Sequence, residues 1–513
     1  MININEKKTN CCGCTACAQV CPKNCITMEA DAEGFSYPVV DTDKCISCNR
    51  CDSVCPIINK VEAASGDDYP KAIGGWHKDE DIRALSSSGG AFSLFAQEIL
   101  EQGGVVYGCA LDDKAAARHI CVDSLDDLDK LRGSKYVQSA LDDVYESIRK
   151  LLEEGRKVLF TGAPCQAAGL CSYLGDKRSD NLYLIDFICH GVPSPRVFAE
   201  YIAETEKEAG SRVTGFKFRL KDHGWSGSGM QLGTCAEFEN GDSIRNYPAF
   251  RDPFMNGFLD DTYLRPSCYD CSFKDVKKGY SDFTIADFWG VDKVSDKLND
   301  GKGTSLIIIH NEHARELWNN VKDNFFYQEV STDAAIKRNR SIKQSPARSR
   351  RRDRFFTDLD SKGYKYVKRK YMSGLTWAWH RLWKMFGRFE QFIKFSFVGV
   401  SNTVISLAVY YICIFLGLHY MLAYTLGFLL SVCNAFFWNN RYVFTNKQEK
   451  SIVRAFLKVL TSYGFSFLLS LVLMGLLVDI LKIPQVIAPL LKMTVTIPIN
   501  FVLNKVWAFK DKK

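Results

Sequence analysis

The sequence predicts a multidomain membrane protein with three distinct structural parts. A cysteine run is duplicated within the first 56 residues, strand-like and amphipathic helical runs alternate from about 75 to 330, and four long apolar stretches follow residue 390. We therefore expect a small α+β cluster-binding module, an α/β redox domain and a C-terminal all-α four-helix transmembrane domain. The 513 residues leave room for this organisation, and the net charge of +7 is modest.

The two cysteine runs share one spacing, Cys-x2-Cys-x2-Cys-x3-Cys-Pro, at residues 11–22 and 45–56. Two-cluster bacterial ferredoxins have this pattern, and the fourth cysteine of each run ligates the cluster that the other run holds. One [4Fe–4S] cluster is therefore assigned to Cys11, Cys14, Cys17 and Cys55. The second is assigned to Cys45, Cys48, Cys51 and Cys21. Cys12 and Cys25 fall outside the spacing and are not expected to be ligands.

A disulfide framework and zinc knuckles are the alternative explanations for these cysteines. Disulfides are typical of secreted chains, and residues 1–10 lack the apolar run of a signal peptide. Zinc sites usually show isolated cysteine pairs, not a duplicated triple run that ends in proline. We therefore expect electron-carrying clusters in a ferredoxin-like domain at residues 1–60, facing a reducing cytoplasm.

Short motifs in the middle of the chain stand where strands are expected to end or helices to begin. Strands are predicted at 105–107, 157–160, 182–187 and 305–310, and helices at 91–102 and 139–154. The Ser/Gly run at 86–90 precedes a helix, where free backbone N–H groups can bind phosphate, although such loops also cap helices without a ligand. Two further motifs follow strands and place Cys165 and Cys189 where open α/β sheets bind ligands.

Together these motifs resemble the coenzyme F420-reducing hydrogenase/dehydrogenase beta subunits. The resemblance covers about residues 1–330 and rests on SSSGG, LRGSKYVQS, TGAPCQ, DFICHGVPSP, CYDC and IADFWG, in that order. It implies an N-terminal region at 75–155, a C-terminal region at 156–330 and a bound flavin, taken as FAD. It also implies electron exchange with a two-electron partner, which in the methanogen enzymes is a deazaflavin coenzyme. By the same resemblance, the flavin would lie near Ser87, Ser88, Gly89, Gly90, Lys135, Thr161 and Gly162.

A third [4Fe–4S] cluster would then fit beside the flavin. Four cysteines lie inside these motifs, and four thiolates complete a cubane: Cys165, Cys189, Cys268 and Cys271. The alternative is that Cys165 and Cys189 are buried free thiols. His190 could serve as an acid, a base or an alternative ligand, although a lone histidine in a loop more often only forms local hydrogen bonds. Cys165 and His190 are the candidate catalytic residues.

After about residue 331 the chain becomes basic and then apolar. Residues 331–390 are expected to form a basic linker and an interfacial helix at a cytoplasmic membrane face. A nucleic-acid-binding arm is the alternative, but interleaved aromatic residues and a folded reader are missing. Apolar stretches near 396–417, 420–438, 456–480 and 485–506 could each cross a hydrocarbon core of about 30 Å, and a buried soluble bundle is the alternative. The distribution of Lys and Arg predicts that both termini are cytoplasmic.

The apolar region, about residues 391–510, resembles the GtrA family. FIKFSFVGVSNTVIS begins the first stretch, and FxxNxxYxF at 436–444 is repeated as FxxNxxWxF at 501–509. An interfacial belt of aromatic residues could account for part of that match. The resemblance implies a four-span inner-membrane protein of cell-surface polysaccharide synthesis that moves or presents polyprenyl-phosphate-linked sugars. Polar groups in a membrane are unfavourable unless they are used, so Ser401, Asn402, Asn434 and Asn500 are candidates for headgroup contact.

The combined expectation is a membrane-anchored iron–sulfur flavoprotein oxidoreductase linked to lipid-linked sugar synthesis. One alternative is a polyprenyl-phosphate-sugar carrier or flippase subunit with a regulatory redox head, and another is the beta subunit of an F420-dependent hydrogenase or dehydrogenase. The expected partners are the lipid bilayer, a polyprenyl-phosphate-linked sugar, and an electron-carrier protein or the deazaflavin; nucleic acid is not expected. A radical S-adenosylmethionine enzyme is disfavoured because the sequence has no Cys-x3-Cys-x2-Cys run.

Overall fold

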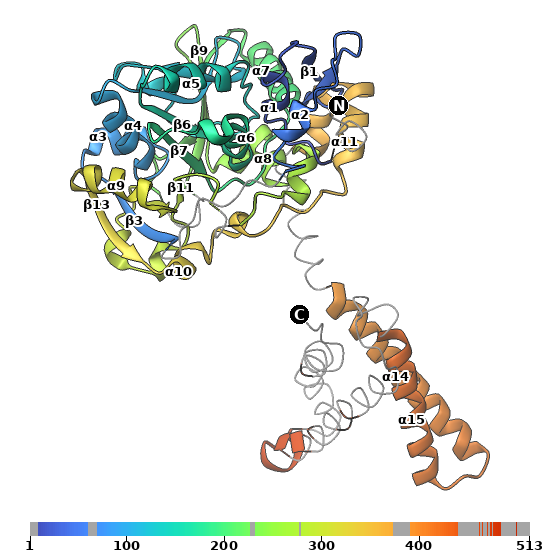
Figure 1. The fold of residues 1–513 in the computed structure, drawn as a ribbon. Helices are drawn as coiled ribbons and strands as arrows, with labels where there is room; N and C mark the ends of the chain where they lie inside the picture. The colour runs from blue at the N-terminus through green and yellow to red at the C-terminus, as the bar shows by residue number, and fades with distance from the viewer. Residues whose placement is uncertain are drawn as a thin grey trace. The chain divides into compact units, whose positions relative to one another are not determined.

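The computed structural model divides the chain into two units, Met1–Trp377 and Ala378–Lys513. It describes residues 9–59, 69–225, 231–275, 279–372 and 390–439, with short pieces between 461 and 499. Figure 1 shows the elements of both units.

The first unit begins with a small α+β module built around the cysteine runs. Its two short helices, α1 (Ala16–Gln19) and α2 (Arg50–Ser53), each lie within one run. Between them, β1 (Ile26–Ala30) pairs antiparallel with β2 (Ser36–Val40). The proline that ends each run prevents the short helix from continuing. Thiols, Phe35 and Tyr37 form the core of this module, as expected for a ferredoxin-like domain.

An eight-stranded mixed sheet forms the centre of the redox domain, in the order β13-β3-β12-β11-β7-β6-β4-β5. The strands β11, β7, β6 and β4 run parallel, and the outer strands pair antiparallel. The carboxyl ends of the parallel strands therefore meet at one edge, where open α/β sheets bind ligands. The strand bounds are β3 (Lys71–His77), β4 (Val105–Leu111), β5 (Ala117–Val122), β6 (Val158–Gly162), β7 (Leu182–Phe187), β11 (Phe283–Asp287), β12 (Ser305–Ile309) and β13 (Phe325–Val330).

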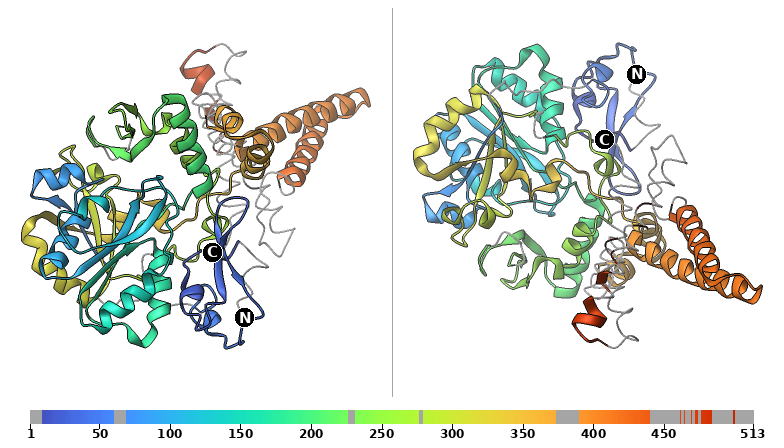
Figure 2. Two further views of the ribbon diagram at one scale, coloured as in Figure 1. Left: turned by 90° about the horizontal axis from the view of Figure 1, so that it is seen from above. Right: turned by 90° about the horizontal axis from the view of Figure 1, so that it is seen from below.

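Helices cover both faces of this sheet (Figure 2). On one face, α4 (Ala91–Glu101) and α9 (Glu312–Val321) pack over the side chain of Val106. On the other, α5 (Val144–Glu153) and α6 (Pro164–Leu174) pack over Val105 and Tyr107, because successive side chains of a strand point to opposite faces. The predicted strand at 182–187 and the predicted helix at 91–102 are both present.

A lobe with an aromatic core completes the first unit. It contains α7 (Pro195–Ala209), α8 (Pro253–Leu259) and a three-stranded sheet of β8 (Val213–Leu220), β9 (Gly233–Phe238) and β10 (Ser243–Asn246). The helices α11 (Arg352–Lys362) and α12 (Tyr364–Tyr371) bury Phe355, Leu359 and Val367 in the same core. The described part of the segment expected to be a linker thus contains three helices, α10 (Thr332–Ile336), α11 and α12, of which α11 and α12 pack into this core. The first unit continues to Trp377.

The second unit contains a helical hairpin of α14 (Glu390–Phe415) and α15 (Tyr420–Trp438). Within the described residues, Phe397–Phe415 is the one helix that is long and apolar enough to cross a membrane, and Leu429–Trp438 is a shorter apolar helix. The stretches expected at 456–480 and 485–506, and the repeat copy at 501–509, lie largely or wholly outside the described residues. Residues 373–389 of the segment expected to form the basic linker and interfacial helix also lie outside them. The four-helix arrangement therefore stays a prediction.

Candidate metal centres and cofactor site

The four cysteines assigned to the first cluster line one hollow in the N-terminal module. Cys11, Cys14 and Cys17 come from the first run, and Cys55 is the fourth cysteine of the second run, as the crossed ligation pattern requires. Four soft thiols in one hollow suit an iron–sulfur cluster. The other lining residues are Cys12, Gly13, Thr15, Met28, Pro38 and Ile57.

The four cysteines assigned to the second cluster, Cys21, Cys45, Cys48 and Cys51, line a second hollow. Cys25 also lines it, with its Sγ 3.3 Å from Sγ of Cys21. Cys48 is exposed, whereas all four cysteines of the first set are buried. The second thiol set is therefore the more exposed of the two.

The four motif cysteines of the redox domain line a larger cavity of about 220 Å³. Cys165 lies in the first turn of α6, Cys189 follows β7, and Cys268 and Cys271 lie at a 3-10 turn, Pro266–Asp270. Burial raises the pKa of the Cys189 thiol to about 11 and that of Cys268 to about 12. These free thiols are protonated at neutral pH, so a metal would displace protons on binding.

The arrangement of the thiols distinguishes a cluster from a single metal ion. In the part of the chain that the structure describes, no three His, Cys, Asp or Glu side chains are grouped as the ligands of one ion would be. A cubane spreads its thiolates over four iron atoms, so they stand farther apart than the ligands of one zinc ion. The three shared hollows are compatible with this wider spacing.

His190 lines the same cavity as Cys165. Its Nε2 lies 2.6 Å from Oδ1 of Asp261, and its Nδ1 lies 3.3 Å from Oγ of Ser341. Lys274 donates to the backbone oxygens of Cys189 and His190. The two expected catalytic residues thus share one cavity, and hydrogen bonds to both nitrogens fix the orientation of the imidazole.

A buried polar chain, which the sequence reasoning missed, lines another part of this cavity. Thr284 Oγ1 donates to Oδ1 of Asp186 at 2.5 Å and lies 2.8 Å from Nε2 of His310. Burial raises the pKa of Asp186 to about 7 and lowers that of His310 to about 4. The sequence feature that could have indicated this buried polar chain is an aspartate inside the apolar run LYLIDF.

Arg265, also missed from sequence, joins the first thiol hollow to the redox domain. Its side chain is fully buried, and Nε donates to the backbone oxygen of Cys11 at 2.8 Å. One terminal nitrogen lies 3.6 Å from Sγ of Cys11 and donates to the oxygen of Ser36, and the guanidinium stacks on Tyr37. The other terminal nitrogen donates to Gln138, which in turn donates to the oxygen of Cys12. A permanent positive charge therefore lies against the first thiol set.

The loops expected near a flavin contact one another beside α4. Both the backbone N and the Oγ of Ser134 donate to Oγ of Ser87, at 2.8 and 3.0 Å. Nζ of Lys135 donates to the carbonyl oxygens of three residues of its own turn, and burial lowers its pKa to about 8. Thr161 and Gly162 end β6, and Thr161 Oγ1 donates to the oxygen of Tyr107 at 3.0 Å.

The Ser/Gly loop depends on close backbone approach. A side chain at Gly89 would place its Cβ 2.4 Å from the oxygen of Gly75, and Gly90 caps α4 with φ +90. Gly89 N donates to Oγ of Ser305 at 3.0 Å, and Ala91 N lies 3.5 Å from the same atom. Ser305 therefore satisfies these two donors, so the helix-capping interpretation describes this part of the loop.

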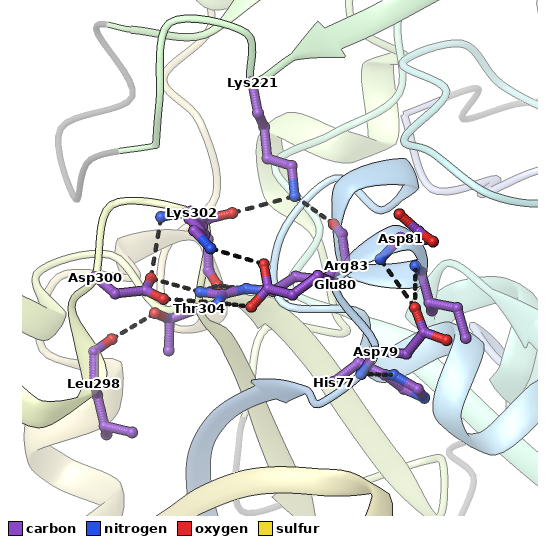
Figure 3. Close-up of polar contacts among 12 residues, drawn as sticks. His77, Asp79, Glu80, Asp81, Arg83, Lys221, Leu298, Asp300, Lys302 and Thr304 are labelled. Atoms are coloured by element: carbon purple, nitrogen blue, oxygen red, sulfur yellow. Dashed lines mark hydrogen bonds and ion pairs between the residues drawn. The ribbon is translucent and has the colours of Figure 1, made fainter.

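A polar network holds this loop against residues 298–304 (Figure 3). Arg83, which is 1% exposed, donates to both carboxylate oxygens of Asp300 at 2.7 and 2.6 Å and to the oxygen of Gly303. Nζ of Lys221 donates to the oxygens of Arg83 and Ser88, at 2.6 and 2.8 Å. Three segments that are distant in sequence therefore fix the position of the Ser/Gly loop.

In the second unit, three of the four polar residues expected to contact a headgroup lie together. Asn434 Nδ2 on α15 donates to Oγ of Ser401 and to Oδ1 of Asn402 on α14, both at 2.7 Å. Asn500, the fourth, lies outside the described residues. A side chain at Gly427 would meet the backbone oxygen of Ser406 at 2.7 Å, so small residues allow the two helices to approach closely.

The fold and the thiol sets define an iron–sulfur oxidoreductase head joined to a membrane domain. Family models confirm each part: a 4Fe-4S dicluster domain at residues 10–58, the N-term and C terminus of the coenzyme F420 hydrogenase/dehydrogenase beta subunit at 72–146 and 155–334, and the GtrA/DPMS transmembrane domain at 394–509. The chain belongs to the GtrA/DPMS family through its C-terminal domain, and its redox region is of the coenzyme F420 hydrogenase/dehydrogenase beta-subunit type.

Known relatives match separate parts of the chain. A subunit of the F(420)H(2) dehydrogenase of Methanosarcina mazei is 25% identical over 171 residues, which is 31% of this chain and 46% of the relative. The chain thus spans less than half the length of that protein. The cell wall teichoic acid glycosylation protein GtcA of Listeria monocytogenes is 30% identical over 125 residues, 24% of this chain and 86% of the relative. The bactoprenol-linked glucose translocase of Shigella phage SfV is 31% identical over 123 residues, which cover 24% of this chain and 97% of that protein.

Proposed function

We propose that the chain is a membrane-anchored iron–sulfur flavoprotein oxidoreductase whose chemistry serves lipid-linked sugar or cell-surface polysaccharide synthesis. The observation that carries the proposal is the third cavity, because three separate segments contribute four thiols to it beside the ferredoxin-like module. Cys12 also lines the cavity, so five thiols share it, and the four motif thiols are enough to complete a cubane.

Each thiol set would hold one [4Fe–4S] cluster, which carries electrons one at a time. The first set is Cys11, Cys14, Cys17 and Cys55, the second is Cys21, Cys45, Cys48 and Cys51, and the third is Cys165, Cys189, Cys268 and Cys271. The exposure of Cys48, with the 57% exposed Ile46 beside it, supports the second set as the approach point of an external electron partner.

A bound FAD would exchange electrons singly with the clusters and in pairs with a substrate. The match to the beta-subunit N-term model and the meeting of Ser87, Ser134 and Lys135 support a site beside α4. Because Ser305 already accepts from Gly89 and Ala91, we place the direct contact at the Ser87 hydroxyl. Lys135, whose Nζ already donates to three backbone oxygens of its own turn, would position that turn. Ser88, Gly89, Gly90, Thr161 and Gly162 would shape and position the surrounding loops.

His190 is the residue proposed to move a proton in the third cavity. Asp261 and Ser341 contact the two ring nitrogens, so the imidazole keeps one orientation in the cavity. Cys165 would act as a cluster ligand on another part of the cavity wall.

The membrane domain is the basis for the proposed sugar connection. GtcA and the phage translocase are named for teichoic acid glycosylation and for translocation of a bactoprenol-linked glucose, and the chain covers 86% and 97% of them. The polar cluster of Ser401, Asn402 and Asn434 is the proposed contact for a phosphate-sugar headgroup. The positive-inside bias supports four spans with a cytoplasmic redox head and cytoplasmic termini.

The proposal is tested by replacing one third-set cysteine in the full-length, detergent-solubilised protein. Cys165→Ser should lower the iron content by about four atoms per chain, because a cubane holds four. Cys171→Ser is the matched control, since Cys171 lies on the same helix but its Sγ faces the oxygen of Tyr280. Equal iron contents in the two variants would contradict the third cluster.

The alternative is a sugar-lipid carrier whose redox head only regulates transport. The chain covers 86% and 97% of the length of the two relatives named for teichoic acid glycosylation and glucose translocation, but only 46% of the dehydrogenase subunit. This difference favours the carrier alternative. Transport of a polyprenyl-linked sugar into vesicles by Cys165→Ser at the wild-type rate, with loss of all electron transfer, would support the regulatory role. Reduction of a deazaflavin by the wild-type chain would instead support the alternative of an F420-dependent beta subunit.

A further inference from the structure

Cys12, which the cysteine spacing leaves without a role, lies between two thiol sets. It lines the first hollow and also the third cavity. Cys12 therefore lies in the wall of the hollow that the first thiol set shares and in the wall of the cavity that the third set shares.

The helix α6 adds a second contact at the same place. Figure 1 shows α1 of the N-terminal module beside α6. Cys165 lies in the first turn of α6, and Gly169 lies one turn later on the same face. A side chain at Gly169 would place its Cβ 2.8 Å from Cβ and 3.0 Å from Sγ of Cys14. The absence of a side chain at residue 169 thus allows the backbone of α6 to lie directly against Cys14.

Hydrogen bonds between the modules keep this junction closed. Oε1 of Gln19 accepts from the backbone N of Tyr145 at 2.8 Å, and the Tyr145 hydroxyl donates to the oxygen of Gln166 on α6 at 2.7 Å. Gln138 donates to the backbone oxygen of Cys12 and is itself held by Arg265. The loop that carries Cys12 is therefore fixed from both sides.

We propose that Cys12 and the Gly169 contact form the bridge through which single electrons pass between the first and third clusters. This inference rests on the proposed function, because it requires a cluster in the third cavity. Electron transfer falls steeply with distance and favours paths through bonds and direct contacts. Electrons would therefore pass from the second cluster, near the exposed Cys48, to the buried first cluster. From there they would pass by way of Cys12 to the third cluster.

The proposed step is a simple one-electron exchange. With clusters held by the first and third thiol sets, the contact at Cys12 would let one electron pass, so that the loss at the first cluster would equal the gain at the third. No bond forms or breaks, and Cys12 neither gains nor loses a proton. The electron originates from an external one-electron donor, for which dithionite serves in the test.

The test compares Cys12→Ala with Cys25→Ala in the full-length, cluster-loaded protein in detergent. Cys25 is the matched control because it is the extra thiol of the second hollow. Samples are mixed with dithionite under anaerobic conditions, frozen at increasing times and examined by electron paramagnetic resonance. The third-cluster signal is identified as the one that Cys165→Ser removes. Iron is counted in every sample.

Cys12→Ala should retain the wild-type iron content and slow the appearance of the third-cluster signal about tenfold, equivalent to about 1.4 kcal/mol of activation free energy. Cys25→Ala should match the wild type. Gly169→Val should weaken the magnetic interaction between the two reduced clusters, because the added side chain separates α6 from Cys14. Gly169→Val tests the contact between α6 and Cys14 while the Cys12 thiol stays in place.

Three results would overturn the bridge. Wild-type kinetics in Cys12→Ala would show that electrons take another path, and loss of about four iron atoms from that variant would make Cys12 a ligand. A wild-type protein with only about eight iron atoms would instead refute the proposed third cluster, and with it the bridge.

Discussion

Arg265 is predicted to raise the reduction potential of the first cluster. Its guanidinium is fully buried 3.6 Å from Sγ of Cys11, and reduction adds a negative charge to the cluster. Two unit charges at that distance interact by about 4.6 kcal/mol with an effective dielectric constant of about 20. This energy corresponds to about 200 mV for a one-electron couple. The cluster charge is spread over four iron atoms, so we expect Arg265→Gln to lower the potential by about 100 mV.

The assay is an anaerobic redox titration followed by electron paramagnetic resonance, with iron counted before and after. Arg265→Lys is the matched variant, since it keeps the charge while losing the forked hydrogen bonds. The second cluster, which has its own thiol set, is the internal reference in the same sample. A shift below about 30 mV in Arg265→Gln, or an equal shift of both ferredoxin-type clusters, would refute the electrostatic reasoning.

The other predictions concern the Ser/Gly loop, the cavity and the membrane hairpin. Gly89→Ala should release bound flavin and lower the free energy of unfolding by about 1–3 kcal/mol, because the Cβ of the alanine would lie 2.4 Å from the oxygen of Gly75. Flavin absorbance measures the first effect and thermal denaturation the second. Asp186 has a pKa of about 7 when folded against an ordinary 3.8, so the folded state binds more protons between these values and loses stability as the pH rises from about 4 to 7. Asp186→Asn should remove that loss, with an upper bound of about 4 kcal/mol, in thermal denaturation measured across this range. Asn434→Leu should weaken the α14–α15 hairpin by about 1–2 kcal/mol in detergent, because two interhelical hydrogen bonds are lost.

Each of these variants has a control. Gly103→Ala changes a glycine with positive φ that has no atom within 4 Å of its Cβ, so this variant should lose some stability but keep the flavin. A pH dependence that is identical in Asp186→Asn and the wild type would show that Asp186 ionises normally. Cys433→Ala changes the exposed neighbour of Asn434 and should leave the hairpin unaffected. Equal stability of Asn434→Leu would rule out a structural contribution of the interhelical hydrogen bonds.

The predictions that the structure and the family models confirmed rested on local sequence patterns. The strand at 182–187 was recognisable because a continuous apolar run needs no distant partner to be identified. The cysteine runs were equally clear, since the spacing itself reflects the geometry of a cubane. The family models bear out both resemblances.

Contacts made over long sequence separations were not predictable. Cys12 acquires its place only when α6 docks on the N-terminal module, and the spacing of the run contains no information about that docking. Arg265 appeared as an ordinary charged residue until its burial against Cys11 was seen. The basic charges of residues 350–371 hid the apolar positions of α11 and α12, among them Phe355 and Val367, which are fully buried.

The most direct test of the whole account is the cofactor content of the full-length protein, purified anaerobically in detergent. Iron, acid-labile sulfide and flavin would be measured per chain in the same preparation. Three cubanes and a flavin site predict about twelve iron atoms, about twelve sulfides and one flavin. About eight iron atoms without flavin would contradict the account and leave an intact ferredoxin-like module on a membrane carrier.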